Sequence, residues 1–188
     1  MIKPAGLKSE ANIGVISPSY WIAEDVLKNT SEIFSSRNFH LTFGKSIMAK
    51  EGPFAGPPEL RAEDLNNMFA DPNIDAIFCA RGGYGANRVL PLLNYDLIKE
   101  NPKIFIGYSD ITAYLTSITQ KTEIITFHGP MLVSYKHGFI DYNFDQMMKT
   151  LTRTENIVIS PPEEFDPHIL KKGTAKGPLW GGNLSLVM

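Results

Sequence analysis

The sequence contains a single cysteine, Cys79, among 188 residues, so no disulfide can form within the chain. Cys79 stands in the apolar run Ile74–Ala80, which favours a small buried side chain over a reactive thiol. His40, His137 and His168 have no partner at metal-ligand spacing, and a Cys/His pattern for zinc is missing. The sequence therefore predicts no metal site, and we expect no cofactor.

Long apolar runs and blocks of positive charge are also missing. No stretch approaches the roughly 18 apolar residues that span a bilayer, and residues Met1 to Asn12 lack the apolar region of a secretory signal. A formal charge of -2 without basic clusters offers no surface to a phosphate backbone or an anionic membrane. We therefore expect a soluble, cytoplasmic protein that binds neither nucleic acid nor membranes.

Short apolar runs alternate with amphipathic stretches along the chain, and 43% of the residues are apolar. This order is typical of an α/β fold, a mostly parallel sheet with helices on both faces. The predicted strands are residues 13–16, 39–43, 74–80, 104–106, 124–127 and 157–159. The predicted helices lie around residues 26–34, 61–70, 89–93, 111–119 and 143–151, with Pro91 shortening the third.

The composition changes near residue 160, where a proline-rich stretch begins. We predict a main α/β domain over residues 1–160, a linker over 161–174 and the start of a second domain over 175–188. The chain ends inside the apolar segment Leu184–Met188 without a polar tail, so we expect a truncated second domain. Pairing of two copies through this segment, as a homodimer, is left open.

Ser109 stands where parallel sheets gather their functional groups, just after the carboxyl end of a strand. In the segment Gly107-Tyr-Ser-Asp110, Gly107 allows a sharp turn that would expose the serine hydroxyl at the start of a helix. The alternative is that Ser109 or Asp110 only caps that helix. The common hydrolase motif is not matched, because Ile111 replaces its second glycine.

A second strand end carries the glycine-rich segment Arg81-Gly-Gly-Tyr-Gly85. Backbone N–H groups of such a loop, those of Gly82 and Gly83 among them, can converge on a phosphate or on a tetrahedral oxyanion. The alternative is a tight strand-to-helix turn without function. The spacing fits neither the dinucleotide fingerprint nor the triphosphate-binding loop, which disfavours nucleotide binding.

Four further side chains lie close to these segments in the sequence. His128 follows a strand and is the histidine placed to reach Ser109 as a base, with a structural role in its loop as the alternative. Arg81 and Tyr84 belong to the glycine-rich segment, and Tyr108 directly precedes Ser109. We expect these three side chains and that of His128 to line the site.

Five motifs occur in a fixed order, and together they resemble one family. They are Ile13-Gly-Val-Ile-Ser-Pro-Ser19, Arg81-Gly-Gly-Tyr-Gly85, Ile106-Gly-Tyr-Ser-Asp110, Phe127-His-Gly-Pro130 and Leu179-Trp-Gly-Gly-Asn-Leu184. On these motifs the chain resembles the L,D-carboxypeptidases, which include muramoyl-tetrapeptide carboxypeptidases and microcin-C self-immunity proteins. The resemblance runs essentially end to end and implies a first domain like that of class I amidotransferases.

The resemblance implies that Ser109 is the nucleophile of a serine peptidase. It implies an oxyanion hole built from the backbone N–H of Asp110 and that of either Gly82 or Gly83. The family's glutamate and histidine come from a second domain, so these partners are expected beyond Met188. The 188-residue piece by itself is therefore expected to be inactive.

The resemblance also implies the substrate. A murein peptide, from which the terminal D-alanine is removed during peptidoglycan recycling, is the leading candidate, and His128 keeps only a loop-shaping role. Hydrolysis of a peptide-nucleotide amide by an immunity-type enzyme is one alternative. A non-catalytic domain that binds a small ligand is another.

Overall fold

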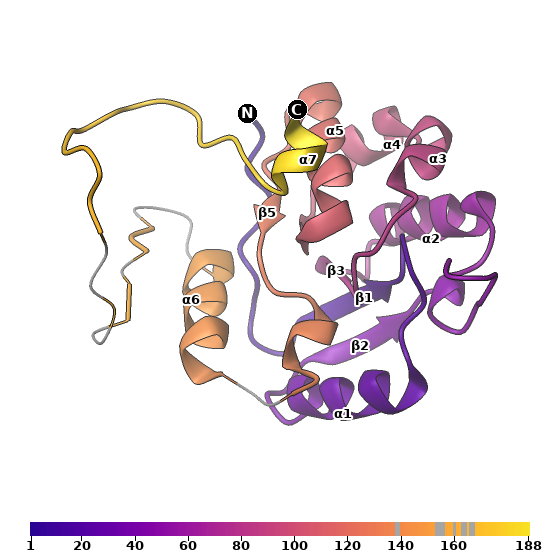
Figure 1. The fold of residues 1–188 in the computed structure, drawn as a ribbon. Coiled ribbons are helices and arrows are strands. Elements are labelled where there is room, and N and C mark those ends of the chain that lie inside the picture. The colour runs from indigo at the N-terminus through magenta and orange to yellow at the C-terminus, as the bar shows by residue number, and fades with distance from the viewer. Residues whose placement is uncertain (138–139, 153–156, 160, 163–164, 166–167) are drawn as a thin grey trace.

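The computed structural model describes residues 1–137, 140–152, 157–159, 161–162, 165 and 168–188. Within these ranges one five-stranded sheet, with the order β2-β1-β3-β4-β5, forms the centre of the molecule (Figure 1). Every pair of neighbouring strands is parallel. The strands are β1 (Asn12–Ile16), β2 (His40–Phe43), β3 (Ala76–Cys79), β4 (Ile104–Gly107) and β5 (Phe127–His128).

Helices connect the strands and extend the chain beyond them. The α-helices are α1 (Glu24–Ser35), α2 (Pro58–Ala70), α3 (Ala86–Val89), α4 (Tyr95–Glu100), α5 (Thr112–Thr122), α6 (Asp141–Thr152) and α7 (Leu184–Val187). Short 3₁₀ helices are η1 (Lys45–Ile47), η2 (Leu90–Leu92), η3 (Ser109–Ile111) and η4 (Leu132–Tyr135). No helix within the described ranges is long and apolar enough to cross a bilayer.

The three central strands are buried along nearly their whole length, whereas the edge strand β2 is mostly exposed. In a strand with one face in water, apolar and polar residues alternate. The central strands are buried on both faces, and this explains why their sequences are continuous apolar runs. Their register places Phe78 between Val15 and Ile106. The predicted α/β fold with a parallel sheet is thus confirmed.

Each face of the sheet has its own core, as Figure 1 shows by the helices on either side. On one face Phe105 of β4 packs with residues of α2 to α5, including Tyr114. On the other face Phe34 of α1 contacts three aromatic rings edge-on, with centroids 5.7 to 5.9 Å away. Those rings belong to β3, η4 and α6, so this aromatic cluster seals the second face.

Two predicted strands differ from the structure. Residues 124–127 were expected in one strand, but β5 covers only Phe127–His128, because Ile124 pairs instead with Ile2 near the N-terminus. Residues 157–159 form no strand, since their side chains face solvent and no neighbouring strand lies beside them in the described ranges. Pro91 does end the predicted helix early: α3 stops at Val89 and η2 follows.

The end of the chain returns to α5, next to the N-terminus (Figure 1). The Asn183 N–H donates to Thr112 Oγ1 at 2.9 Å and so anchors α7. Leu184 and Met188 remain 70% and 92% exposed. Residue 160 at the predicted boundary and residues 163, 164, 166 and 167 of the predicted linker fall outside the described residues, so the domain division stays a prediction.

Cys79 is fully buried at the end of β3, and burial raises the pKa of its thiol well above the ordinary value. The thiolate, which is the reactive form, is therefore suppressed. We expect a thiol-reactive disulfide reagent to leave the native protein unmodified at mildly alkaline pH and to titrate this thiol after unfolding. Equal reaction rates in the native and unfolded states would contradict the burial.

Candidate active site

Ser109 sits in a sharp turn between β4 and α5. Its backbone φ is +62°, a left-handed conformation that residues with a Cβ seldom adopt. Such strain clusters at functional sites, and a serine between a strand and a helix is the geometry of a nucleophile turn. The side chain is half-buried.

The interpretation of Ser109 and Asp110 as caps of the following helix is wrong. Tyr108 precedes η3 and Ile111 precedes α5, and neither helix start has a side-chain capping bond. Among the described residues, the Ser109 hydroxyl makes no hydrogen bond. The hydroxyl is therefore available for chemistry rather than used in holding the helix.

Gly107 allows this turn to close. A Cβ at Gly107 would lie 2.8 Å from Ile111 Cγ2, too close for any side chain. Ile111 stands where the common hydrolase motif has glycine, and it is fully buried in the core beside α5. The chain therefore keeps the first glycine of the motif, Gly107, and uses the position of the second for a buried isoleucine.

The glycine-rich segment lies against Ser109. A Cβ at Gly82 would be 3.0 Å from Ser109 Cβ and 3.3 Å from its Oγ, so the absence of a side chain at Gly82 leaves the hydroxyl accessible. Gly83 has φ +139°, and a Cβ there would overlap the Tyr20 ring. Gly85, with φ +105°, precedes α3 and would meet the Phe54 ring at 2.8 Å. The structure thus brings together the two segments that the sequence picked out.

A third loop, between β1 and α1, completes the site, and sequence reasoning gave its residues no role. The Ser19 hydroxyl donates to Asp110 Oδ2 at 2.6 Å, and the Tyr20 N–H donates to Gly82 O at 3.4 Å. A signal was available, because Ser17-Pro-Ser19 ends the first strand of a parallel sheet, at the edge where the other two loops lie.

The remaining predicted residues surround the site at different distances. Arg81 donates to Trp21 O at 3.3 Å and holds its guanidinium 5.7 Å from the Tyr20 ring. Tyr84 is 60% exposed and Tyr108 37% exposed. Both tyrosine rings are therefore open to a ligand that approaches from solvent.

His128 lies on β5, in register with Gly107 of β4. Its ring centroid is 6.3 Å from that of Tyr108, and the side chain is exposed. Among the described residues no hydrogen bond joins His128 to Ser109. His128 therefore flanks the turn without acting on its hydroxyl in this arrangement.

Buried hydrogen bonds to the carbonyl of Pro18 hold the loop between β1 and α1 in place. Pro18 O accepts hydrogen bonds from Arg61 Nη1 at 3.1 Å and from the Tyr114 hydroxyl at 2.7 Å. Arg61 is only 1% exposed, and burial lowers the pKa of its guanidinium. Burial also raises the pKa of Tyr114 well above the ordinary value, so its hydroxyl stays a donor.

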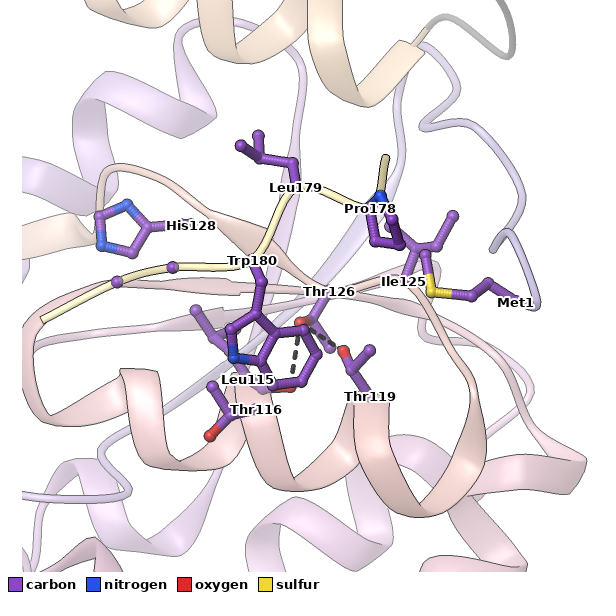
Figure 2. A pocket seen from close by; sticks show the side chains of 12 residues that line it. Met1, Leu115, Thr116, Thr119, Ile125, Thr126, His128, Pro178, Leu179 and Trp180 are labelled. Atoms are coloured by element: carbon purple, nitrogen blue, oxygen red, sulfur yellow. Dashed lines mark hydrogen bonds between the residues drawn. The ribbon is translucent and has the colours of Figure 1, made fainter. Parts of the chain in front are cut away.

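Two cavities of about 370 Å³ each lie beside the Ser109 turn, at the β5 edge. His128, Thr126 and Leu179 line both of them, while Ser109 lines neither. In the first, shown in Figure 2, the Trp180 indole lies over α5 near Thr116. Within the described part of the chain, no group of three or more His, Cys, Asp or Glu side chains is arranged to hold a metal.

Residues 13–129, which include the three loops, match the family model described as the LD-carboxypeptidase N-terminal domain. The chain belongs to the LD-carboxypeptidase family. This membership agrees with the resemblance drawn from the five motifs. It also accounts for the parallel sheet with its nucleophile-like turn.

Individual relatives support the same assignment. A probable murein peptide carboxypeptidase of Bacillus subtilis is 35% identical over 190 residues, which cover 98% of this chain and 58% of the relative. The microcin C7 self-immunity protein of Escherichia coli is 38% identical over 128 residues, covering 66% of this chain and 37% of that protein. This chain therefore spans little more than half, or less, of the length of these curated relatives.

A solved structure extends the likeness to three dimensions. The microcin C7 self-immunity protein in complex with aspartyl sulfamoyl adenosine superposes with a TM-score of 0.79 at 33% identity. The likeness covers 83% of this chain and 48% of that one.

Proposed function

We propose that this chain is the nucleophile-bearing part of a cytoplasmic serine-type L,D-carboxypeptidase that removes the terminal D-alanine from murein tetrapeptides. The observation that carries the proposal is the strained Ser109 turn, which holds an unbonded hydroxyl against Gly82. Family membership supports the peptidase class. The name of the Bacillus relative supports a murein peptide as the substrate.

In this mechanism Ser109 Oγ attacks the carbonyl carbon of the amide that joins the L-centre to D-alanine. The carbonyl oxygen becomes an oxyanion, which accepts hydrogen bonds from the N–H of Asp110 and from that of Gly82 or Gly83. During the attack the general base takes the proton of the Ser109 hydroxyl. Collapse then breaks the C–N bond, and the base passes this proton to the nitrogen of D-alanine, which leaves as an amine. Water then hydrolyses the acyl-serine ester.

The general base is proposed to be a histidine that lies, with its glutamate partner, in sequence beyond Met188. The exposure of His128 and the lack of a bond to Ser109 support a loop-shaping role for His128 instead. Tyr84, Tyr108 and Arg81 are proposed to line the peptide site from the two flanking loops.

The test uses the full-length protein, including the sequence that follows this chain. We expect it to release D-alanine from a murein tetrapeptide and to leave a matched tetrapeptide that ends in L-alanine intact. A fluorophosphonate probe should label Ser109. Failure of both reactions would reject the peptidase and favour a non-catalytic binding domain.

A second candidate function, cleavage of a peptide-nucleotide amide, has its own support. The structural neighbour binds aspartyl sulfamoyl adenosine, and Trp180 offers a flat ring at a cavity next to the Ser109 turn. The same hydrolytic steps would apply to either substrate. Faster turnover of an aminoacyl sulfamoyl adenosine than of the tetrapeptide would favour this candidate.

Gly83→Val in the full-length protein is expected to lower kcat by about 10²–10³, the typical effect of losing one oxyanion donor. A side chain at φ +139° is strained and overlaps the Tyr20 ring, so the loop must shift away from Ser109. KM should change little, because the donors act mainly on the transition state. Gly52→Ala is the matched control: its φ is +56°, but no atom lies within 4 Å of the added Cβ. An effect on KM alone would contradict the oxyanion role.

A further inference from the structure

The carboxylate of Asp110 is buried at the junction of the three loops, with only 5% of the residue exposed. Its Oδ2 accepts two hydrogen bonds, one from the Ser19 hydroxyl at 2.6 Å and one from the Ala86 N–H at 3.1 Å. The ion pairs found among the described residues, at Lys45 and Arg37, do not include Asp110. Burying a carboxylate is costly, and these two hydrogen bonds offset part of that cost, as does the charge of the nearby buried Arg61, whose pKa burial lowers and the Asp110 charge acts to raise.

Both ends of the glycine-rich loop are tied to the neighbourhood of this carboxylate. At the far end, Ala86 is the first residue of α3, directly after Gly85, and its N–H binds Asp110. At the near end, Gly82 O accepts from the N–H of Tyr20, the residue that follows Ser19. The loop is therefore held between Asp110 itself and the segment that Asp110 binds.

This bridge spans parts of the chain that ordinary pairing leaves apart. The strands β3 and β4 are paired only as far as Phe78 and Ile106, so each loop leaves the sheet before reaching the site. One proposed oxyanion donor, the Asp110 N–H, lies in the turn after β4. The other, the N–H of Gly82 or Gly83, lies in the loop after β3. Two donors must lie about 2.7–3.1 Å from one oxygen to act together.

We propose that the Asp110 side chain, held by Ser19, is a positioning group that fixes the two halves of the oxyanion hole relative to each other. The inference rests on the proposed function, because it requires the two N–H groups to act on a developing oxyanion. The Asp110 backbone contributes a donor, and its side chain aligns the partner donor. One residue thereby couples the nucleophile turn to the glycine-rich loop.

A simple capping role does not explain the arrangement. The α3 helix has four residues and its N-cap is Gly85, which has no side chain, so a local cap is missing. The carboxylate that binds Ala86 comes from 24 residues further along the chain, and it also holds Ser19 from 91 residues before it. The carboxylate therefore links three loops in addition to satisfying the first N–H of α3.

The test compares Asp110→Ala, Asp110→Asn and Ser19→Ala in the full-length protein. Asp110→Ala removes the bridge and should lower kcat about 10²-fold, the effect of a small misplacement of catalytic groups, with KM changed less than about threefold. Asp110→Asn keeps an oxygen that can accept both bonds, so it should stay within about tenfold of wild type. Ser19→Ala should lower kcat about tenfold, and adding it to Asp110→Ala should cause no further loss.

Thr122→Val is the control for stability. Thr122 is a buried hydroxyl at the far end of α5, where it donates to Ile118 O at 2.7 Å and accepts from the Ile124 N–H at 3.2 Å. It should lower Tm while leaving kcat unchanged. The rate of fluorophosphonate labelling at Ser109 should fall in parallel with kcat for Asp110→Ala and Ser19→Ala, because the phosphonyl oxygen occupies the oxyanion hole.

The outcomes separate this inference from the proposed function. If Ser109→Ala abolishes turnover but Ser19→Ala and Asp110→Ala lower only Tm, the positioning role is overturned and the function stands. If Ser109→Ala retains turnover, the proposed function itself fails. Should Asp110→Ala not fold, Ser19→Ala decides by the same measurement: an unchanged kcat and labelling rate overturn the role.

Discussion

Ser109→Ala in the full-length protein is expected to lower kcat by about 10⁶-fold, the scale on which serine hydrolases lose activity with their nucleophile. Alanine keeps the Cβ at φ +62°, so the backbone strain and the contact with Gly82 are unchanged. The substitution removes only the attacking oxygen, and Tm should stay the same. Release of D-alanine and thermal unfolding are measured on the same preparation.

Ser109→Gly provides the matched control, because it removes the oxygen and also relieves the left-handed strain, which costs about 1–2 kcal/mol for residues with a Cβ. We expect this variant to be as inactive as Ser109→Ala and at least as stable. Turnover within tenfold of wild type for either variant would exclude Ser109 as the nucleophile.

The 188-residue chain expressed by itself should be inactive on the murein tetrapeptide, or nearly so. It contains the proposed nucleophile turn and the two loops proposed to form the oxyanion hole, but among the described residues the histidine near this turn, His128, does not bond to Ser109. Without a base the serine hydroxyl stays protonated, and loss of a triad member leaves only about 10³–10⁴ of the rate enhancement over water. The chain and the full-length protein are assayed side by side at equal concentration.

Comparable activity from the two proteins would contradict a base beyond Met188. His128 would then be the leading candidate, and His128→Ala in the 188-residue chain would have to abolish the activity. The exposed side chains of Leu184 and Met188 also predict self-association of this chain, which size-exclusion chromatography measures across a dilution series.

Much of the fold was readable from local patterns. The apolar runs of β1, β3 and β4 predicted buried central strands, because only strands covered on both faces lose their alternation. Pro91 correctly ended a helix for a local reason, the missing N–H. The prediction of a strand at residues 157–159 was wrong, because an apolar run by itself does not show whether a neighbouring strand is available to pair with it.

The position of the candidate site in the fold could also be predicted from the sequence. Parallel strands share one carboxyl edge, so Ser109 and the glycine-rich segment could be placed there without knowledge of the side chains. The roles of Ser19 and Tyr20 were missed, although their motif was noted, because no local pattern shows which distant group a loop serine will bind. The direct approach of Gly82 to Ser109 was missed for the same reason.

The sequence by itself determined the α/β class and the strand-end location of the candidate site, since both follow from short segments with local periodicity, and the resemblance of its five motifs pointed to the family. Only the tertiary structure decided that Ser109 adopts a left-handed backbone and that Asp110 bridges three loops. Both depend on contacts between segments far apart in the chain. The Ser19 to Asp110 bond joins residues 91 positions apart, and its geometry arises only when β1, β3 and β4 are packed side by side.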